Sequence, residues 1–243
     1  MKLISKALFL LGLNGLLVNN ILAEGHNDSA SSEQSQIHAA VTHVLKANHN
    51  FVDRHKSDYF LPFVKGQKPK ATVVTCADSR VHSHAIDPHP DGDLFMVRDI
   101  GNQVATAKGS IEYGIRHLHT PLLLIVGHSM CGAVRAAMTD YSTLEPAIKD
   151  DLSTIHVSKG NPEDLDQVKD AVEANVNQQV ALAVKLFQPE LEQGKLIIIG
   201  SVYDFRNDYK KGSGRLVFTN VNGETEPQKI KQSLTFSKGV VTK

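Results

Sequence analysis

Three short, nearly continuous apolar runs restrict most strongly how this chain can fold. They occupy residues 71–75, 122–126 and 196–199, and each follows shortly after a proline or a glycine. A weaker run, residues 94–97, lies between the first two. Apolar stretches of this length, rich in β-branched residues and without polar alternation, are typical of strands that are buried on both faces of a parallel sheet.

Helical patterns of apolar residues separate these runs. The patterns cover residues 37–59, 107–118, 133–139 and 162–187. Strands that alternate with helices predict an α/β fold. Residues 215–219 follow a turn-rich segment and are expected to add an antiparallel edge strand beside residues 196–202. Because no repeat or linker interrupts the pattern, we expect a single α/β domain with a mostly parallel central sheet flanked by helices.

The overall charge excludes some classes of partner. The 26 basic and 26 acidic residues balance, so the chain has no net field that would attract nucleic acid or an anionic membrane. The apolar content of 41% is ordinary for a globular domain and too high for a disordered one.

The first residues are typical of a signal peptide. Lys2 and Lys6 precede an apolar stretch, residues 7–18, and Ala23 is a candidate last residue before cleavage. The stretch is shorter than the roughly 20 residues of a membrane-spanning helix. We therefore expect export to the periplasm or the exterior, with no stable membrane span after cleavage. The predicted organisation is a signal peptide at 1–23, a flexible leader at 24–36, a folded domain at 37–220 and a tail at 221–243.

The two cysteines and one histidine follow the predicted strands. Cys76 comes directly after the first run, His128 after the second, and Cys131 three residues later. Parallel neighbouring strands end at the same edge of a sheet, where sites of open α/β folds form. Two thiolates and an imidazole suit zinc and leave a fourth position for water. Two cysteines in an exported chain also suit a structural disulfide, and this alternative remains open.

Two charged residues lie just beyond the first cysteine. The Asp78 carboxylate could accept a hydrogen bond from a zinc-bound hydroxide, and Arg80 could hold that carboxylate in a bidentate pair. Asp78 could instead move onto zinc as a fourth ligand and close the site. The alternative for these two residues is an ordinary ion pair in a turn.

At these residues the chain resembles the β-carbonic anhydrases. The resemblance rests on Cys-x-Asp-Ser-Arg at 76–80 together with Gly-His-x-x-Cys-Gly at 127–132. It implies a lyase with one Zn²⁺ per chain that catalyses the reversible hydration of carbon dioxide to bicarbonate and a proton. Zinc lowers the pKa of a bound water, and the resulting hydroxide would attack carbon dioxide.

The resemblance also implies a substrate site and an assembly. Gln67 matches a glutamine that hydrogen-bonds substrate, and Phe95, Ile100 and Tyr113 match the apolar pocket around carbon dioxide. The amino-terminal helix is expected to pack on a neighbouring subunit, in a homodimer or a higher even homo-oligomer.

Two positions depart from the common family pattern. Val73 replaces the tryptophan of members with a regulatory bicarbonate site, which implies the plant-like subtype. Asp99 stands where an asparagine is usual.

Other functions are compatible with the same residues. The zinc centre could act on carbonyl sulfide or carbon disulfide, or the chain could be an exported zinc-binding protein without catalysis, or a disulfide-bonded binding module. His82, His84 and His89 follow Arg80 closely and could bind a second metal or shuttle protons, although solvated loop histidines are the favoured interpretation.

Overall fold

The computed structural model describes residues 33–234 and 241–243, which divide into one compact unit ending at Phe60 and a second from Leu61 to Lys243. The predicted signal peptide at 1–23 lies outside the described residues. Of the predicted leader, only residues 33–36 are described, and they belong to a helix. Among the described residues, no helix combines the length and apolar character needed to cross a membrane.

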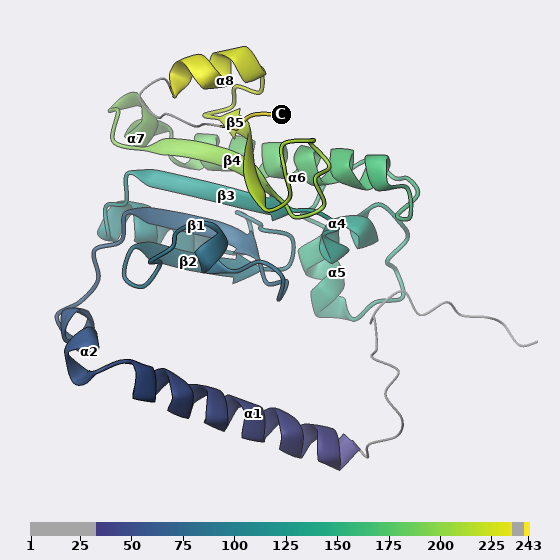
Figure 1. The fold of residues 1–243 in the computed structure, drawn as a ribbon. Helices are drawn as coiled ribbons and strands as arrows, with labels where there is room; N and C mark the ends of the chain where they lie inside the picture. Colours follow the sequence, from purple (N-terminus) through teal and green to yellow (C-terminus); the bar gives the residue numbers. More distant parts are fainter. Residues whose placement is uncertain (1–32, 235–240) are drawn as a thin grey trace, which may run out of the picture. The chain divides into compact units, whose positions relative to one another are not determined.

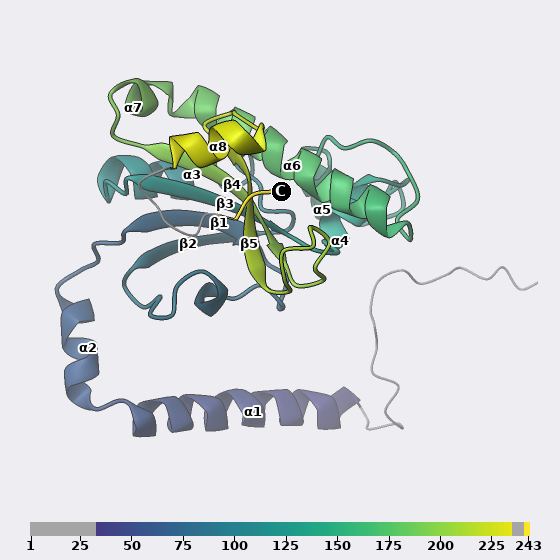
Figure 2. The same ribbon diagram turned by 45° about the horizontal axis from the view of Figure 1, so that its top comes forward.

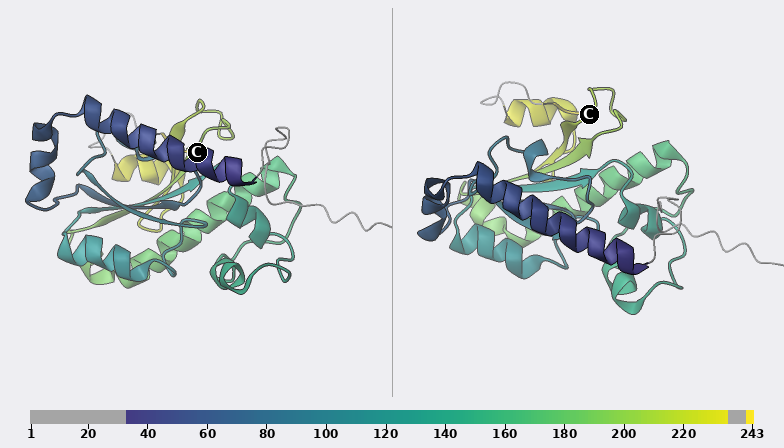
Figure 3. Two further views of the ribbon diagram at one scale, coloured as in Figure 1. Left: turned by 90° about the horizontal axis from the view of Figure 1, so that it is seen from below. Right: turned by 60° about the horizontal axis from the view of Figure 1, so that its bottom comes forward.

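The second unit is built on a twisted five-stranded sheet (Figures 1 and 3). Its strands are β1 (Ala71–Cys76), β2 (Leu94–Asp99), β3 (Leu122–His128), β4 (Ile197–Asp204) and β5 (Arg215–Val221). They lie in the order β2-β1-β3-β4-β5, and all neighbours are parallel except β4 and β5. The predicted α/β class, the parallel sheet and the antiparallel edge strand are confirmed.

Burial on both faces explains why the strand runs show no polar alternation. Val74, Ile125 and Ile198 contribute to a core on one face of the sheet. Val73 and Val126 contribute to a separate core on the other face. Successive residues of a strand point to opposite faces, so a strand covered on both sides is apolar throughout.

Helices cover the two faces. They are α3 (Lys108–Glu112), which continues as a π-helical turn (Tyr113–His117), α4 (Gly132–Ala137), α5 (Pro146–Leu152), α6 (Leu165–Leu186), α7 (Gln188–Glu192) and α8 (Pro227–Ser233). Figure 2 shows the long α6 running across the sheet, where it packs on β3 and β4. The Asp164 side chain caps α6 by accepting hydrogen bonds from the backbone N–H groups of Asp166 and Gln167.

Two glycines allow α6 to approach the sheet closely. A Cβ at Gly127 would lie 2.6 Å from Val176 Cγ2, and one at Gly200 would lie 2.8 Å from Val176 Cγ1. These distances are shorter than carbon–carbon contacts allow. The glycine before His128 therefore permits the helix packing that supports the end of β3.

Regular structure continues into the segment predicted as a tail. In α8, Ile230 is buried together with the following Leu234, and both join the core that contains Val73. The backbone N–H of Phe218 donates to Val241 O at 2.8 Å, and Thr242 forms a parallel bridge with Phe218.

The first unit is helical and its apolar residues are uncovered. It contains α1 (Glu33–Arg54) and the start of α2 (Ser57–Val64), and no residue of either helix is buried. The exposed apolar side chains of α1 are Ile37, Val41, Val44, Leu45, Phe51 and Val52. Pro62 lies inside α2, which continues through it for two residues. Only one helical hydrogen bond is lost so near the end of a helix.

Candidate metal centre

Three elements bring the predicted metal ligands together. Cys76 ends β1, His128 ends β3, and Cys131 directly precedes α4. Their ligand atoms lie within 4.8 Å of one another, and all three residues are buried. The two sulfurs are 3.9 Å apart and both cysteines are free. Because a disulfide bond is about 2.05 Å long, this geometry is not that of the alternative disulfide.

The orientation of His128 leaves one ring nitrogen available. Its Nδ1 lies 3.0 Å from Ser129 O, and a carbonyl oxygen can only accept, so Nδ1 carries the proton. Its Nε2 is buried and has no hydrogen-bond partner among the described residues. A buried nitrogen lone pair without a partner is costly unless a ligand occupies it. The arrangement is that of a metal-binding imidazole oriented by a backbone carbonyl.

The two thiols differ in acidity. The Cys131 thiol, which donates to Cys76, lowers the pKa of Cys76 to about 4 against the opposing effect of burial, and His128 lowers it further. The same hydrogen bond, together with burial, raises the pKa of Cys131 well above its ordinary value. The metal-free pair therefore holds one negative charge near neutral pH. A divalent cation between the sulfurs would favour two thiolates.

Asp78 and Arg80 form a bidentate pair beside this cluster. Arg80 Nε donates to Asp78 Oδ1 at 2.9 Å, and Arg80 Nη2 donates to Asp78 Oδ2 at 2.7 Å. The Arg80 side chain thereby lowers the pKa of Asp78 to about 2, although burial opposes the shift. Asp78 Oδ2 is 3.8 Å from His128 Nε2. The carboxylate is thus ionised and lies next to the atom that would bind the metal.

Arg98 is a residue of this site that the sequence analysis did not single out. Its guanidinium donates to Cys76 O at 2.9 and 3.1 Å, and to Asp78 O and Val81 O at 2.8 Å each. Arg98 therefore holds the backbone that carries both the first ligand and the carboxylate. An arginine directly after a predicted strand, between the predicted pocket residues Phe95 and Ile100, was the available signal.

The predicted substrate residues lie in two places. Ile100 follows β2 at the metal end of the sheet and packs against the cluster of Leu152 and Ile155. Phe95 contacts Tyr113, with 5.9 Å between ring centroids. In the sheet, Phe95 is the register partner of Thr72, which lies four residues before Cys76 on β1. Four strand residues span about 13 Å.

Gln67 also lies away from the ligands. It precedes β1 and lines a cavity of about 640 Å³ together with Phe63 and Gly92. The structure therefore places Ile100 at the edge of the sheet where the metal ligands lie. Gln67, Phe95 and Tyr113 lie toward the opposite edge of the sheet in the same subunit.

The loop histidines do not converge. His82, His84 and His89 are exposed, and the rings of the first two are 6.5 Å apart. Within the described residues, Cys76, His128 and Cys131 form the one group of three or more potential metal ligands. A second metal site at the histidines is not supported.

Comparison with known proteins agrees with the ligand geometry. A family model described as carbonic anhydrase matches residues 71–210, which is more than half of the chain. The chain belongs to the carbonic anhydrase family. Carbonic anhydrase 2 of Mycobacterium tuberculosis is 32% identical over 155 residues, which cover 60% of this chain and 75% of that protein.

Solved β-carbonic anhydrases share the fold. A Coccomyxa enzyme, solved in complex with acetazolamide, gives a TM-score of 0.61 at 23% identity and covers 83% of this chain and 99% of its own. A tetrameric enzyme from Sordaria macrospora gives 0.59 at 20% identity and covers 76% of this chain and 97% of its own. The chain therefore has the fold of these β-carbonic anhydrases.

The residues of the cluster fit the zinc that β-carbonic anhydrases use. Two sulfurs and the unpartnered His128 Nε2 form a three-ligand set of the donor types that zinc prefers. The backbone N–H of Gly101 lies 3.4 Å from Cys76 Sγ, where it can stabilise a thiolate.

Asp99 is a partly buried residue at the end of β2, where it pairs in register with Cys76. Burial raises its pKa to about 6, although the Thr106 hydroxyl and the Gln103 N–H donate to its oxygens at 2.5 and 2.8 Å. An aspartate at the usual asparagine position thus accepts hydrogen bonds from local donors but keeps its proton to a higher pH than an ordinary aspartate.

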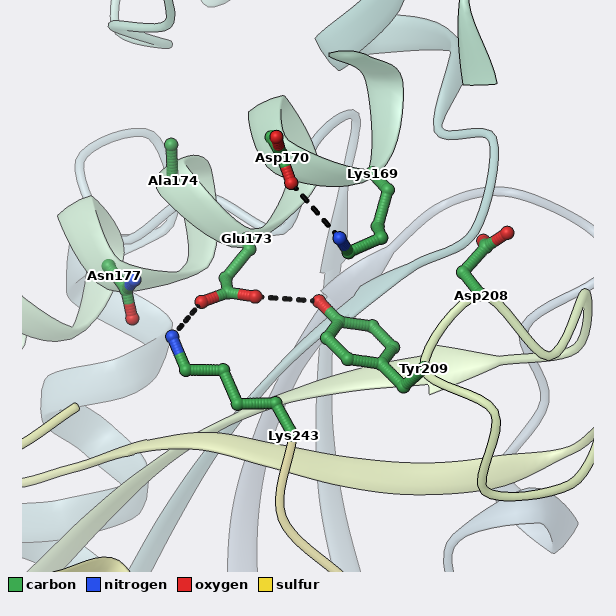
Figure 4. Close-up of a pocket in the computed structure, with 8 residues that line it drawn as sticks. All are labelled: Lys169, Asp170, Glu173, Ala174, Asn177, Asp208, Tyr209 and Lys243. Carbon is green, nitrogen blue, oxygen red and sulfur yellow. Dashed lines mark hydrogen bonds and ion pairs between the residues drawn. The ribbon is translucent and has the colours of Figure 1, made fainter. Parts of the chain in front are cut away.

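A separate cavity of about 570 Å³ lies along α6 (Figure 4). Glu173 accepts from Tyr209 Oη at 3.0 Å and pairs with Lys243, while Lys169 pairs with Asp170 at 3.1 Å. The charges that line it are largely paired with each other, and none of the predicted site residues contributes to it.

Proposed function

We propose that this chain is a zinc-dependent carbonic anhydrase that interconverts carbon dioxide and water with bicarbonate and a proton. Cys76, His128 and Cys131 would hold the zinc. The observation that carries the proposal is the buried convergence of these three donors with His128 Nε2 unpartnered. Family membership supports the reaction assigned to this site.

The residues around the metal have separate tasks. Zinc, when bound by three protein ligands, supplies the Lewis acidity that makes water a nucleophile near neutral pH. Asp78 stays ionised because Arg80 donates two hydrogen bonds to it, so it can accept a hydrogen bond and orient the nucleophile. Arg98 keeps the backbone of Cys76 and Asp78 in place. Bicarbonate would leave as water returns, and buffer would accept the proton.

The test combines metal content with turnover. We expect one zinc per chain and carbon dioxide hydration in stopped-flow assays, with a loss of at least about 100-fold in Asp78→Ala, in the range for a group that positions a reacting atom. Asp170→Ala, which removes an exposed carboxylate outside the site, is the matched control. Bound zinc without hydration would leave the non-catalytic zinc-binding function, and turnover of carbonyl sulfide or carbon disulfide alone would favour those substrates.

We further propose that two chains complete each active site. Gln67, Phe95 and Tyr113 lie too far along β1 and β2 to reach the metal of their own chain, and Tyr113 is 47% exposed. In a twofold dimer, these residues of one chain can meet the metal end of the other. The exposed stripe of α1 is a suitable surface for packing on the partner. The tetrameric Sordaria enzyme supports an even assembly.

Complementation between inactive variants tests the shared site. Asp78→Ala and the double variant Gln67→Leu/Tyr113→Ala are each expected to be inactive alone. When they are co-expressed, each mixed dimer has one intact site, so about a quarter of wild-type activity should return if the chains pair at random. If all these residues acted within one chain, no mixed dimer would contain an intact site and activity would not return.

A separate experiment tests whether the exposed apolar side chains of α1 pack on the partner subunit. Leu45→Asp is expected to shift the protein toward monomers in analytical ultracentrifugation, because it places a charge in the apolar contact. Lys46→Asp, at the next exposed position, is the matched control.

We also propose export to the periplasm or the exterior, from the basic and apolar pattern of residues 1–23. Expression of the full chain in a bacterium should yield mature protein that begins near Glu24. Recovery of protein that retains Met1 in the cytoplasm would contradict export.

A further inference from the structure

Phe205 lies beside His128 and Arg80 although no motif includes it. It directly follows β4, and the pairing of Tyr203 with His128 brings this point of the chain to the edge where the ligands lie. The Phe205 ring is 6.1 Å from the His128 ring, and the Arg80 guanidinium carbon is 5.2 Å from the Phe205 centroid. The Phe205 ring therefore neighbours both a metal ligand, His128, and the hydrogen-bond partner of Asp78, Arg80.

Phe205 is itself held in place. Its ring packs edge-on against Tyr203 at 5.7 Å, and it is only partly exposed. A cation over a ring face is attracted by the electron-rich face of the ring. Phe205 thus offers the Arg80 guanidinium an attractive surface in addition to its hydrogen bonds with Asp78.

Arg80 depends on such support. Its side chain is 50% exposed, and a long exposed side chain loses conformational entropy when it is held in one geometry. Within the site it donates to Asp78 and to Met130 O at 3.2 Å. The cation–π contact with Phe205 adds a third kind of interaction to these hydrogen bonds.

The position of Arg80 decides what Asp78 can do. Asp78 Oδ2 is only 3.8 Å from His128 Nε2, and a carboxylate oxygen is itself a zinc ligand. If Arg80 moves away, Asp78 is free to compete for the open metal position. If Arg80 stays, both carboxylate oxygens of Asp78 remain hydrogen-bonded to Arg80.

We infer that Phe205 is a positioning residue that keeps the metal position open by holding Arg80 against Asp78. The inference rests on the proposed zinc site. It assigns a role in the reaction to a residue outside both sequence motifs. The affinity of a ligand for the fourth metal position then depends on the fraction of molecules in which Arg80 keeps Asp78 away from the metal.

The experiment measures access to the metal without turnover. Cobalt(II) would replace zinc, and azide affinity would be read from the visible spectrum. We expect Phe205→Leu to weaken azide binding about three- to tenfold and to lower kcat for carbon dioxide hydration by a similar factor, the scale of a lost cation–π contact at a partly exposed site. Phe205→Tyr, which keeps the ring face, should retain both. Tyr141→Leu, which removes a different cation–π pair with Lys159, is the control.

A double-mutant cycle identifies the route through Arg80. In an Arg80→Gln background, Phe205→Leu should have no further effect on azide affinity, because the residue on which it acts is absent. An equal loss in that background, or unchanged azide affinity in Phe205→Leu, would overturn the inference. Wild-type protein that binds no cobalt would overturn the proposed function and this inference with it. Wild-type protein that binds cobalt and azide without hydrating carbon dioxide would contradict the function alone.

Discussion

Cys76 Sγ and Cys131 Sγ lie 3.9 Å apart in a buried pocket, although 55 positions separate them in the chain. The hydrogen bond from Cys131 lowers the pKa of Cys76 to about 4. Cys76 is therefore the thiolate of the pair, and a thiolate is the nucleophilic form of cysteine. The same proximity that suits a metal therefore also allows oxidation when the metal is absent.

Metal-free protein should oxidise at this pair. With glutathione disulfide, the Cys76 thiolate would form a mixed disulfide and release one glutathione, and Cys131 would then displace the second to give the protein disulfide. We expect metal-free protein to lose two thiols per chain, whereas zinc-loaded protein keeps both. Thiol titration and mass spectrometry measure this. Cys131→Ser should stop at one bound glutathione, and equal oxidation of both forms would contradict protection by the metal.

Asp99 should make stability depend on pH. Its folded pKa of about 6 lies above the value of about 3.9 for an unfolded aspartate. The folded state retains its proton longer, so the stability that Asp99 contributes is full below about pH 4 and is lost as pH rises through about 6.

The variant Asp99→Asn removes this dependence. Relative to wild type, it should gain about 1–2 kcal/mol of unfolding free energy between pH 4 and pH 7, after allowance for solvent at a partly exposed group. Urea unfolding of reduced, metal-free protein at the two pH values is the measurement. A constant difference between the two proteins would show that Asp99 does not titrate in this range.

Arg98 should affect metal retention more than it affects folding. Arg98→Lys keeps the charge but loses most of the four hydrogen bonds to the carbonyls of Cys76, Asp78 and Val81. Groups that orient a metal ligand typically contribute about tenfold or more to metal affinity. Competition with a chelator should show zinc binding about tenfold weaker. Arg116→Lys, whose ion pairs with Glu112 and Glu190 lie away from the ligands, should leave it unchanged.

Gly127→Ala should destabilise the protein through helix packing. The new methyl group would lie 2.6 Å from Val176 Cγ2, and overpacking of this kind costs about 1–3 kcal/mol. Thermal and urea unfolding measure the loss. Adding Val176→Ala should recover part of it, whereas Gly109→Ala, whose methyl group meets no atom within 4 Å, should not destabilise.

The sequence by itself determined the local elements and the ligand set. Apolar runs without alternation predicted strands covered on both faces, and β1, β3 and β4 have that burial. Cys76 and His128 could be placed together because each ends a strand, and parallel strands end at one edge. These conclusions rest on periodicity and chain order, which can be read along one dimension.

Only the tertiary structure decided which distant residues serve the centre and which do not. Strand register places Phe95 beside Thr72, about four residues from the metal end, and leaves Gln67 and Tyr113 there with it. Arg98 and Phe205 reach the site because β2 and β4 end beside the ligands, at an orientation that no local pattern encodes. Side-chain direction at a sheet edge depends on pairing, twist and the loop that follows, and all three arise from contacts between segments far apart in the chain.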